Sequence, residues 1–462
     1  MTITELPSAV RASYEAKVDR VRAQLAALPA DAPVRLGKAT SNLFRLREPV
    51  ASTRLDVSDF AGVLHVDVAN QTADVLGMTT YEHLVDATLV HGLMPMVVPQ
   101  LKTITLGGAV TGLGIESSSF RAGLPHESVL EMDILTGSGE IVTARPDNEH
   151  AQLFFGFPNS YGTLGYALRL RIQLAPVHRY VELDHVRFHS ADEVAAAIAD
   201  ITHTRSHHGR QVDFLDGTVF APDEIYLTLG RWADHAPYVS DYTGSRIYYR
   251  SIAQRHRDFL TVRDYIWRWD TDWFWCSGGL GVQKPYVRPF IPRRYLRSDT
   301  YFRAVAFARR YAVVDRLAVL RGQPKREYVI QDVEVPVERL AEFLDFFHRE
   351  VGIRPIWLCP LTQLDPQHRW DLYVMAADKT YVNVGFWSSV PIAPGAEDGT
   401  VNRAIEVEVA RLDGRKSLYS NSFYPEAEFW SIYNGATYGV LKAQYDPDGR
   451  LLDLYSKCVA GR

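Results

Sequence analysis

The stretch Val97–Gly123 holds the residues whose types and spacing point most directly to chemistry. It reads VVPQLKTITLGGAVTGLGIESSSFRAG and contains four closely spaced glycines, a fifth glycine at its end and three serines: Gly107, Gly108, Gly112, Gly114, Gly123, Ser117, Ser118 and Ser119. Glycine tolerates positive φ and has no Cβ, so we expect the backbone here to lie against a ligand. Successive N–H groups and the serine hydroxyls would then cup an anion, and a pyrophosphate is the anion this pattern favours.

Two familiar phosphate motifs do not fit this stretch. Gly107 to Gly112 has the spacing of a Walker A loop, but Leu113 stands where that loop requires lysine. The dinucleotide fingerprint G-x-G-x-x-G fails because residue 117 is serine. On the glycine pattern alone, a glycine-rich turn between two strands remains an alternative.

A second polar stretch lies near the N-terminus, at Arg35–Asn42. It reads RLGKATSN, which combines a glycine, a cation and short polar side chains. Such residues suit a second contact to phosphate. An ordinary strand-to-loop turn would have the same composition.

Residues 97–129 as a whole resemble the flavin-binding segment of the delta-24-sterol reductase family, a branch of the vanillyl-alcohol-oxidase-type flavoproteins. The run GIESSS is the most diagnostic part of the resemblance. Similarity continues at Arg145-Pro146, at Ser160–Gly165 (SYGTLG) and at Arg354–Pro360 (RPIWLCP), and the RLGK run resembles the same place in that family. The resemblance implies FAD as the cofactor. It implies non-covalent binding, because neither Arg35–Asn42 nor Leu106–Ser119 contains a histidine or cysteine that could link to the flavin.

The resemblance also assigns the cofactor-binding residues, all of which lie in these segments. They are Lys38, Thr40, Ser41, Asn42, Thr103, Gly107, Gly108, Gly112, Gly114, Ile115, Glu116, Ser117, Ser118, Ser119, Gly123, Gly162, Thr163 and Gly165.

Three residues are candidates for catalysis by the same resemblance. Glu116 would lie close to the isoalloxazine and orient it or relay a proton, although a carboxylate bonded to nearby backbone N–H groups is the alternative. Tyr373, in a predicted strand DLYV, would donate a proton across the pocket unless it is a buried structural tyrosine. Lys416, with Tyr419 and Tyr424, would close the pocket from the C-terminal side.

The composition is that of a globular enzyme with several cores. The chain has 462 residues, 47% apolar residues and a formal charge of −5, so we expect two or three domains and no nucleic-acid partner. Cys276, Cys359 and Cys458 lie far apart, which favours a reducing compartment and no structural metal. The N-terminus lacks an apolar signal-peptide core, and we predict no transmembrane helix. The expected location is cytoplasmic, with peripheral contact at the inner membrane surface.

The elements that must position these residues predict an α+β protein. We expect an N-terminal amphipathic helix within residues 1–30, a PCMH-type FAD-binding domain at 31–177, an α+β substrate cap at 178–425 and a helical segment at 426–462 that packs back on the FAD domain. Predicted strands cover 54–60, 63–77, 166–174 and 328–336, and predicted helices cover 8–28, 81–92 and 337–351.

Aromatic residues crowd residues 248–275, where DYIWRWDTDWFWC alone holds four tryptophans. They would either line an apolar substrate channel or pack a core. The residues available for a channel are Tyr265, Trp267, Trp269, Trp273, Phe274, Trp275 and Trp357.

The resemblance therefore implies an FAD-dependent reductase that saturates an isolated carbon–carbon double bond in a lipid, with NADPH or NADH as the transient donor. We expect a methylene-branched acyl chain, as in the soluble bacterial branch, ahead of a sterol side chain. An oxidase of an alcohol or sugar lactone is the alternative, and a flavin-binding partner of a lipid methyltransferase is a third.

Overall fold

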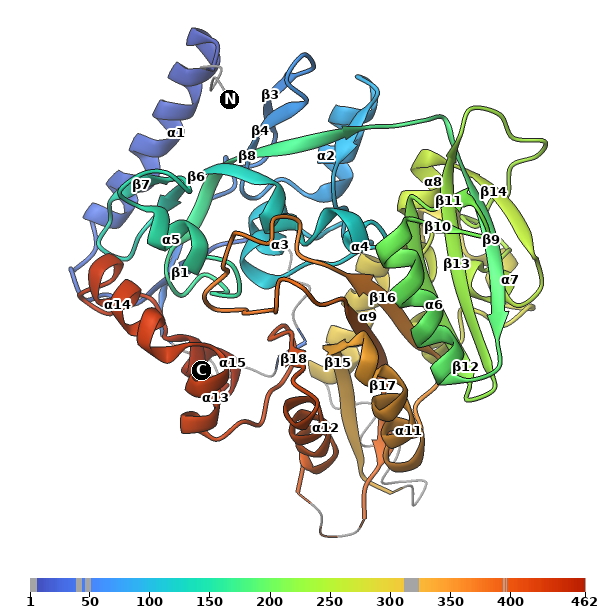
Figure 1. The fold of residues 1–462 in the computed structure, drawn as a ribbon. Helices are drawn as coiled ribbons and strands as arrows, with labels where there is room; N and C mark the ends of the chain where they lie inside the picture. The colour runs from blue at the N-terminus through green and yellow to red at the C-terminus, as the bar shows by residue number, and fades with distance from the viewer. Residues whose placement is uncertain are drawn as a thin grey trace.

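Two large antiparallel sheets, formed one after the other along the chain, organise the fold (Figure 1). The computed structural model describes residues 6–38, 44–45, 51–310, 324–393, 395 and 397–461. The last strand of the first sheet ends at Pro176, and the second sheet begins at Tyr180. Helices cover the outer faces of both sheets, so the chain has the α+β architecture predicted from its sequence.

The first sheet is centred on its longest strand. Its strands are β3 (Val63–Asp67), β4 (Thr72–Leu76), β5 (Leu93–Pro95), β6 (Val129–Leu135), β7 (Ile141–Ala144) and β8 (Tyr166–Pro176). Their order is β3-β4-β8-β6-β7, with β5 also paired to β8. Because side chains alternate along a strand, Leu170 and Ile172 face the core while Arg169 faces the other side. There Arg169 pairs with Asp74 at 2.6 Å and with Asp133 at 2.7 Å.

Helix α1 (Ser8–Ala26) covers that charged face. Its buried residues, Tyr14, Val18, Val21 and Leu25, recur at helical spacing. The Tyr14 hydroxyl donates to Asp133 Oδ2 at 2.8 Å. The predicted N-terminal helix is therefore confirmed. After it, β1 (Val34–Leu36) and β2 (Thr53–Leu55) form a small parallel pair.

Three helices lie on the opposite, apolar side of the first sheet. They are α2 (Tyr81–Leu89), α3 (Leu106–Gly112) and α5 (Ala151–Gly156). Leu84 of α2, Val110 of α3 and Phe154 of α5 share one hydrophobic core with Leu170 and Ile172. The short helix α4 (Ser119–Ala122) follows α3, and its Phe120 packs in the core of the second sheet, so the glycine stretch contacts both sheets.

The second sheet has eight strands in the order β14-β9-β13-β12-β16-β17-β15-β18. They are β9 (Tyr180–Phe188), β12 (Phe214–Ala221), β13 (Glu224–Ala233), β14 (Arg257–Thr261), β15 (Arg326–Pro336), β16 (Ile356–Leu361), β17 (Tyr381–Pro391) and β18 (Arg415–Lys416). A separate small hairpin joins β10 (Ser206–His207) to β11 (Arg210–Gln211).

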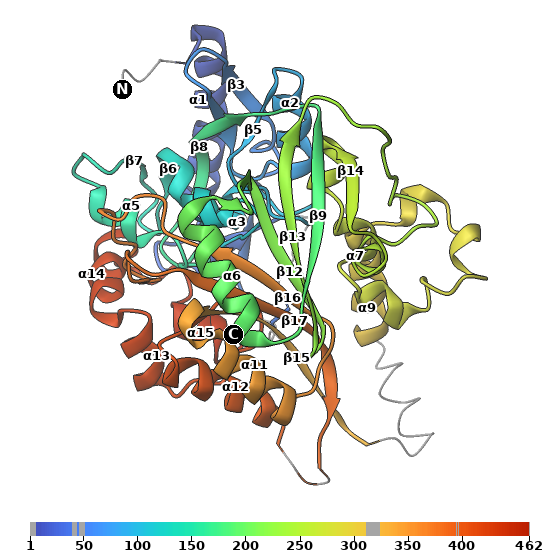
Figure 2. The ribbon, with the colours of Figure 1, turned by 45° about the vertical axis from the view of Figure 1, so that its right-hand side comes forward.

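The two faces of the second sheet differ in character. One face is aliphatic and is covered by α6 (Ala191–Thr204), α11 (Leu340–Glu350) and α12 (Thr400–Arg411), as Figure 2 shows. Val333, Leu358 and Val384 pack there against Ile198 and Phe343. The other face is polar and aromatic, and the elements beside it include α7 (Tyr248–Ile252), α8 (Val262–Ile266) and α9 (Ser298–Arg310).

The chain ends in three helices that return to the first half of the molecule. They are α13 (Glu426–Ile432), α14 (Gly435–Tyr445) and α15 (Leu454–Cys458). The backbone N–H of Ser138 donates to Tyr445 O at 3.0 Å, and Lys442 Nζ donates to Thr163 O at 2.9 Å. Among the described residues, no helix combines the length and the apolar character needed to span a bilayer.

Two predicted strands differ in the structure. Residues 63–77 form a hairpin, because Asp67 accepts the N–H of Asn70 at 3.0 Å and turns the chain between β3 and β4. The strand predicted around Tyr373 is absent. Turn hydrogen bonds replace a ladder there, including one from the Tyr373 N–H to Trp370 O at 3.1 Å.

Candidate active site

The glycine stretch folds as α3, a sharp turn and α4. The Thr105 side chain caps α3 by accepting the Gly108 N–H at 3.2 Å, and Leu113 ends it with a φ of 56°. One side of the stretch is buried in the core and the other is half exposed. The half-exposed residues are Thr103, Ile104, Gly108, Thr111, Gly112, Gly114 and Ile115.

The four glycines do not act through positive φ, and that expectation is wrong, because none of them has it. Their missing Cβ atoms matter instead. A Cβ on Gly107 would lie 2.8 Å from Gly77 O, and one on Gly114 would lie 2.5 Å from Pro99 Cγ. A Cβ on Gly108 would lie 2.8 Å from Thr105 Oγ1, the atom that caps α3. Gly107 and Gly114 therefore allow close packing inside the protein, and Gly108 allows the cap on the half-exposed side of the stretch.

The three serines that follow are buried and bonded to the protein itself. Ser117 Oγ donates to Glu116 Oε2 at 2.5 Å, and Ser118 Oγ donates to Met96 O at 2.8 Å. Ser119 Oγ accepts the Glu116 N–H at 3.1 Å. In this structure the hydroxyls hold Glu116 and the loop in place, so they are not free to bind an anion as predicted.

Glu116 belongs to a buried ionic network. Arg268 donates from Nη1 to Glu116 Oε1 at 3.0 Å and from Nη2 to Asp216 Oδ2 at 2.9 Å. Burial raises the pKa of Asp216, and the charge of Arg268 opposes that rise. Gln100, Ser117 and the Ser118 N–H also donate to Glu116.

These contacts join the first sheet's glycine stretch to the second sheet. Asp216 lies on β12, and the neighbouring Leu215 N–H donates to Ser117 O at 2.8 Å. Because four donors already bind the carboxylate, the contacts of Glu116 give no support to the proton-relay role predicted for it. They make Glu116 part of the joint between the two sheets.

A row of functional side chains crosses the polar face of the second sheet. Cys359 on β16 stands opposite Asn383 on β17, which stands opposite Glu334 on β15. The pairing of Gly217 with Leu358 places Asp216 at the other end, beside Cys359. Residues in register across a sheet are about 5 Å apart and point to the same face. The row therefore connects the ionic network to Glu334.

Glu334 and Tyr373 form a hydrogen-bonded pair at the far end of this row. The Tyr373 hydroxyl donates to Glu334 Oε2, and both residues are buried. Burial raises the pKa of Glu334 to about 8 and also raises that of Tyr373. Tyr373 is held by its neighbour Leu372, whose carbonyl accepts Asn159 Nδ2 at 2.8 Å. A carboxyl group that keeps its proton at neutral pH is thereby joined to a phenol.

Asp332 lies two residues before Glu334 on the same face. Asn383 Nδ2 donates to its Oδ1 at 3.0 Å, and burial raises the pKa of Asp332 to about 6. A Cβ on Gly385 would lie 2.5 Å from that oxygen. Tyr419 is adjacent, since its hydroxyl accepts Trp387 Nε1 at 2.8 Å.

Lys416 does not share this face. It is paired in register with Val333, whose side chain packs on the helix-covered side. Lys416 Nζ donates to Glu406 Oε1 of α12 at 2.7 Å, and burial lowers its pKa while Glu406 opposes that shift. These contacts therefore give no support to the prediction that Lys416 closes the pocket from the C-terminal side. Tyr424 packs with Phe429 and Tyr433 of α13, away from the row.

The turn Ser160–Gly165 contributes a second wall. The Tyr161 N–H donates to Thr111 O at 3.0 Å, Gly162 has a φ of 75°, and the Thr163 hydroxyl donates to Ser160 O. Gly165 is packed inside, because a Cβ there would lie 2.6 Å from Ile134 Cγ2.

Four cofactor residues expected near the N-terminus and one after α4 remain. Lys38 is exposed after β1, and Thr40, Ser41 and Asn42 lie outside the described residues. Gly123 is buried, and a Cβ there would lie 2.3 Å from Glu127 Oε1. The missing side chain of Gly123 thus allows the Glu127 side chain to pack closely against its backbone.

Buried polar atoms beside this turn have no hydrogen-bond partner among the described residues. They are Ser160 Oγ, Ser420 Oγ, Ser422 Oγ, Asn383 Oδ1 and the Nε and Nη2 atoms of Arg45. Arg45 lies 4.8 Å above the Tyr161 ring, and its neighbour Phe44 pairs with Ser420. Buried polar groups normally have partners, so these atoms fit a polar cofactor held between α3, the turn and residues 418–422.

The aromatic residues of 265–275 form a packed core. Trp269 stacks on Phe274 at 4.9 Å, and Phe274 contacts Trp357 and Trp387. All seven residues considered for a channel are less than a tenth exposed. Of the two interpretations of this cluster, a channel or a core, the structure favours core packing. The packed aromatic residues close the polar face of the second sheet.

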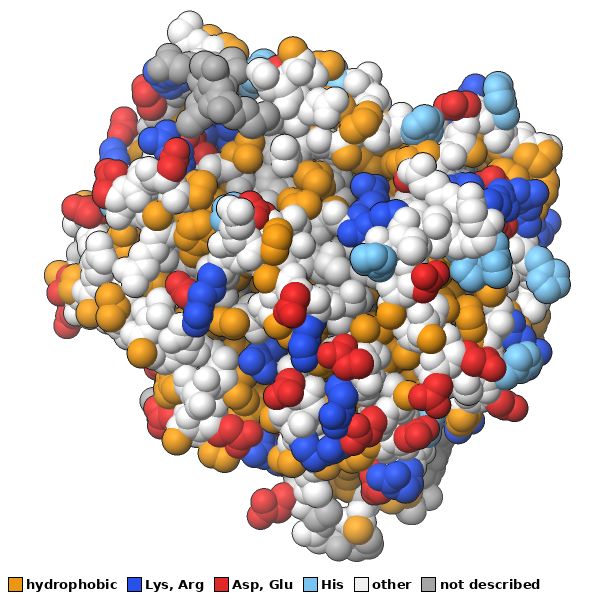
Figure 3. Space-filling view, in the orientation of Figure 1, with side chains coloured by type: hydrophobic (Ala, Val, Ile, Leu, Met, Phe, Trp, Pro, Cys, Tyr) orange, Lys and Arg blue, Asp and Glu red, His pale blue; other side chains and the backbone are white. Residues whose placement is uncertain are grey.

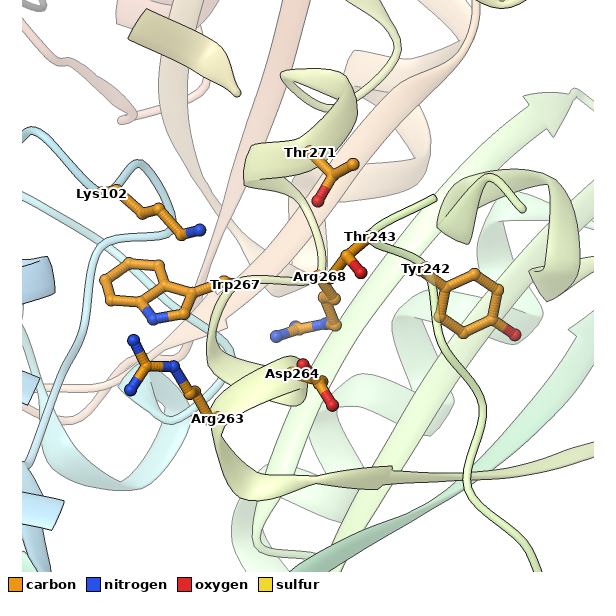
Figure 4. Close-up of a pocket in the computed structure, with 8 residues that line it drawn as sticks. All are labelled: Lys102, Tyr242, Thr243, Arg263, Asp264, Trp267, Arg268 and Thr271. Atoms are coloured by element: carbon orange, nitrogen blue, oxygen red, sulfur yellow. The ribbon is translucent and has the colours of Figure 1, made fainter. Parts of the chain in front are cut away.

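A small cavity of about 110 Å³ lies beside Trp267 (Figure 4). Lys102 and Arg263 flank the indole ring, and Arg268 reaches the same space. Ligand pockets usually exceed about 300 Å³, so this cavity is too small for a flavin or an acyl chain.

Sequence reasoning missed Glu334, Asp332, Asn383 and Arg45. Glu334 and Asp332 had a signal, because two carboxylates recur at alternate positions of the strand YVIQDVEVP among valines. Arg45 and Asn383 had none, since each is placed only by tertiary contacts.

Comparison with known proteins identifies relatives of this chain. Residues 16–145 match the family model described as FAD binding domain. A Delta(24)-sterol reductase homolog of Caenorhabditis elegans is 26% identical over 436 residues, which cover 89% of this chain and 80% of that protein. The Delta(24)-sterol reductase of Arabidopsis thaliana is 26% identical over 449 residues, covering 88% and 77%. The chain is an FAD-dependent oxidoreductase.

The family model extends from α1 to the end of the hairpin β6–β7, so the oxidoreductase contains the PCMH-type FAD-binding domain predicted from GIESSS and its surroundings. The resemblance to the sterol reductases is confirmed over most of the chain. A more distant relative is cytokinin dehydrogenase 5 of Oryza sativa subsp. japonica, 24% identical over 402 residues that cover 82% of this chain and 71% of that protein. The predicted likeness to a soluble bacterial branch stays a prediction.

Proposed function

We propose that the oxidoreductase reduces an isolated carbon–carbon double bond in a lipid, using NADPH or NADH as a transient electron donor. The favoured substrate is a methylene-branched acyl chain, which would become methyl-branched, ahead of an unsaturated sterol side chain. The names of the relatives that match most of the chain support a reductase of an apolar molecule. The aromatic surroundings of the polar row are consistent with such a substrate.

The observation that carries this proposal is the pair Glu334–Tyr373. Reducing an alkene requires a hydride for one carbon and a proton for the other. Tyr373 is a buried phenol that can deliver a proton from Oη, and its partner Glu334 holds a proton near neutral pH. The two residues form a proton-donating pair in an apolar site.

The residues present fit FAD. The half-exposed side of the glycine stretch would lie against the cofactor, and Arg45, Ser160 and Ser420 would bind its polar groups. When bound, FAD supplies a two-electron carrier that accepts hydride from a nicotinamide and passes hydride to an alkene.

The chain's own residues then complete the reaction. Tyr373 protonates the second alkene carbon from Oη, and the Glu334 carboxyl returns a proton to that oxygen. Glu334 is recharged from solvent after product leaves. The substrate gains two hydrogens, one as hydride and one as a proton. Trp357 and Trp387, packed over the row, keep water from the site.

The test is product mass. Purified FAD-loaded chain, NADPH and a methylene-branched acyl lipid in detergent should give a product two hydrogens heavier, and omission of either FAD or NADPH should abolish it. A sterol with an unsaturated side chain is the second substrate to try. Failure with both lipids would overturn the proposal.

The likeness to a cytokinin dehydrogenase favours a second function, namely oxidation of an alcohol or sugar lactone. Stopped-flow reoxidation separates the two. An oxidase reoxidises rapidly with oxygen alone, whereas the proposed reductase reoxidises rapidly only when the unsaturated lipid is added.

A lipid methyltransferase is the partner we propose, because its methylene product would be this reductase's substrate. Turnover by the chain alone would show that the methyltransferase is not required for activity. Co-purification with a methyltransferase from the native host would support the association.

A further inference from the structure

Residues 278–303, here called the aromatic–basic segment, present large apolar side chains to solvent. Leu280 is 41% exposed, Tyr286 68%, Phe290 84% and Tyr295 46%. In Figure 2 the segment lies at the right of the molecule, beside α7 and α9. On a folded protein, a patch of exposed aromatic side chains is more often an interaction site than other parts of the surface are.

The same segment is strongly basic. It contains six basic residues and one acidic residue, Asp299, although the whole chain has a formal charge of −5. Lys284 and Arg294 are exposed, and neither makes a salt bridge with any described residue. Lys284 Nζ lies 5.8 Å from the Tyr286 ring centre, and the Arg294 guanidinium lies 4.8 Å from that of Tyr295. On the face shown in Figure 3, by contrast, acidic and basic side chains are interspersed.

Buried contacts hold the segment in place. Arg288 pairs with Asp272 at 2.5 Å, and its Nε donates to Gly244 O at 2.7 Å. Gln283 Nε2 donates to Ser277 Oγ at 2.9 Å. The exposed side chains are therefore carried by a backbone that buried contacts hold in place.

We propose that the aromatic–basic segment docks on the surface of a bilayer that contains anionic lipids. Aromatic side chains favour the headgroup region, where their apolar rings are buried and their polar tips stay hydrated. Lys284 and Arg294 add attraction to anionic headgroups. The inference rests on the proposed function, because it states where the lipid substrate is met.

A short series of contacts connects this surface to the candidate active site. Gln283 Nε2 donates to Trp275 O at 3.2 Å, and the Trp275 ring lies 5.4 Å from that of Trp387. Trp387 in turn donates to Tyr419 in the polar face. The docked surface is thus connected to the polar face through packed aromatic side chains.

The test is co-sedimentation of the full FAD-loaded chain with two kinds of vesicle. One is pure phosphatidylcholine and the other is an equal mixture with phosphatidylglycerol. We expect partitioning onto the mixed vesicles to be at least about tenfold stronger and to weaken as salt is added, because basic residues near an anionic surface act electrostatically. Equal binding to both vesicles, or to neither, would overturn the proposal.

Variants localise the effect. Tyr286→Ser with Phe290→Ser, and separately Lys284→Glu with Arg294→Glu, should each reduce partitioning about tenfold or more. The matched controls are Val90→Ser with Val440→Ser, and Arg22→Glu with Arg349→Glu, all at exposed positions outside the segment. Retained flavin absorbance checks that each variant is folded. Control variants that lose binding as strongly would show a diffuse effect and refute the proposed surface.

Turnover separates this inference from the proposed function. Segment variants should reduce the lipid at the parental rate in detergent but more slowly in mixed vesicles. If the chain binds vesicles and turns over no lipid, the docking surface stands and the proposed function fails. If detergent-dispersed lipid is reduced and vesicles are not bound, the function stands and the surface is refuted.

Discussion

Glu334 and Tyr373 lie 39 residues apart in the sequence and meet in one hydrogen bond on the polar face of the second sheet. Glu334 lies near the end of β15, and Tyr373 lies in an irregular segment held against the FAD-binding half by Asn159. The pair therefore forms only when both halves of the chain are in place.

The protonation of Glu334 predicts the pH dependence of substrate reduction. Its pKa is about 8 in the folded protein, above the ordinary value, so the proton is present at neutral pH and is lost as pH rises through 8. We expect the rate of lipid reduction to be flat below about pH 7 and to fall about tenfold per pH unit well above 8. Single-turnover kinetics from pH 6 to about 10 measure this.

The matched variants are Glu334→Gln and Tyr373→Phe. The first removes the titrating group and should abolish the alkaline limb while lowering the rate. The second should lower the rate at every pH by about 10²–10⁴-fold. An unchanged alkaline limb in Glu334→Gln would assign the titration to another group.

Gly107 and Gly108 should respond differently to the same substitution. Gly107→Ala places a Cβ 2.8 Å from a backbone oxygen of Gly77, which cannot move freely, so it should lower the free energy of unfolding by ~1–3 kcal/mol. Gly108→Val should leave a folded chain that fails to retain FAD, because the added valine side chain lies on the half-exposed side of the glycine stretch. Denaturant unfolding and flavin absorbance check the two effects. A Gly108→Val protein with full flavin content would contradict this placement of the cofactor.

Removing the cation of the buried network should be strongly destabilising. Arg268→Met leaves Glu116 and Asp216 buried without their partner, and we expect a loss of ~3–5 kcal/mol. The triple variant Arg268→Met, Glu116→Gln, Asp216→Asn removes all three charges and should lose less. Urea unfolding of the single and triple variants measures both losses in the free energy of unfolding. A triple variant less stable than the single one would show that the ionic charges themselves stabilise the joint.

Lys416 should be important for stability and unimportant for the chemistry. Lys416→Met leaves the buried Glu406 with Arg403, 3.6 Å away, as its remaining cation, so we expect a loss of ~1–3 kcal/mol in the free energy of unfolding, and adding Glu406→Gln should recover part of it. The double variant should keep the parental pH profile of reduction. A shifted pH profile of reduction would show that Lys416 acts in the active site.

The flavin should be released by acid precipitation. Neither the glycine stretch nor the turn Ser160–Gly165 contains a histidine or cysteine to form a covalent link. We expect yellow supernatant with FAD as the released species by chromatography. Flavin retained in the pellet would show a covalent bond.

The sequence was most informative where patterns are local. The spacing of Tyr14, Val18, Val21 and Leu25 predicts α1, and the alternation in β6 and β7 predicts their hairpin. GIESSS predicted the correct FAD-binding domain because it is a short motif with a family-specific pattern. The one-sided helical cover of the second sheet also followed from its alternating strands.

Residue roles were less predictable, because they depend on distant partners. Ser117 looked like an anion ligand, but its hydroxyl is bonded to Glu116. Glu116 looked catalytic until Arg268, 152 residues away, paired with it. Lys416 was assigned to the pocket without knowledge of the register that points it to the helix-covered face.

The joint through Glu116, Arg268 and Asp216 restricts how this enzyme can be recombined. Its three members come from the FAD-binding half, the aromatic core and the second sheet, so a graft that exchanges the cap between relatives at residues 177–179 inherits an unmatched buried charge unless all three positions travel together. A replacement of the aromatic–basic segment avoids the same fault only if it begins at residue 272, so that Arg288 and its buried partner Asp272 are exchanged together.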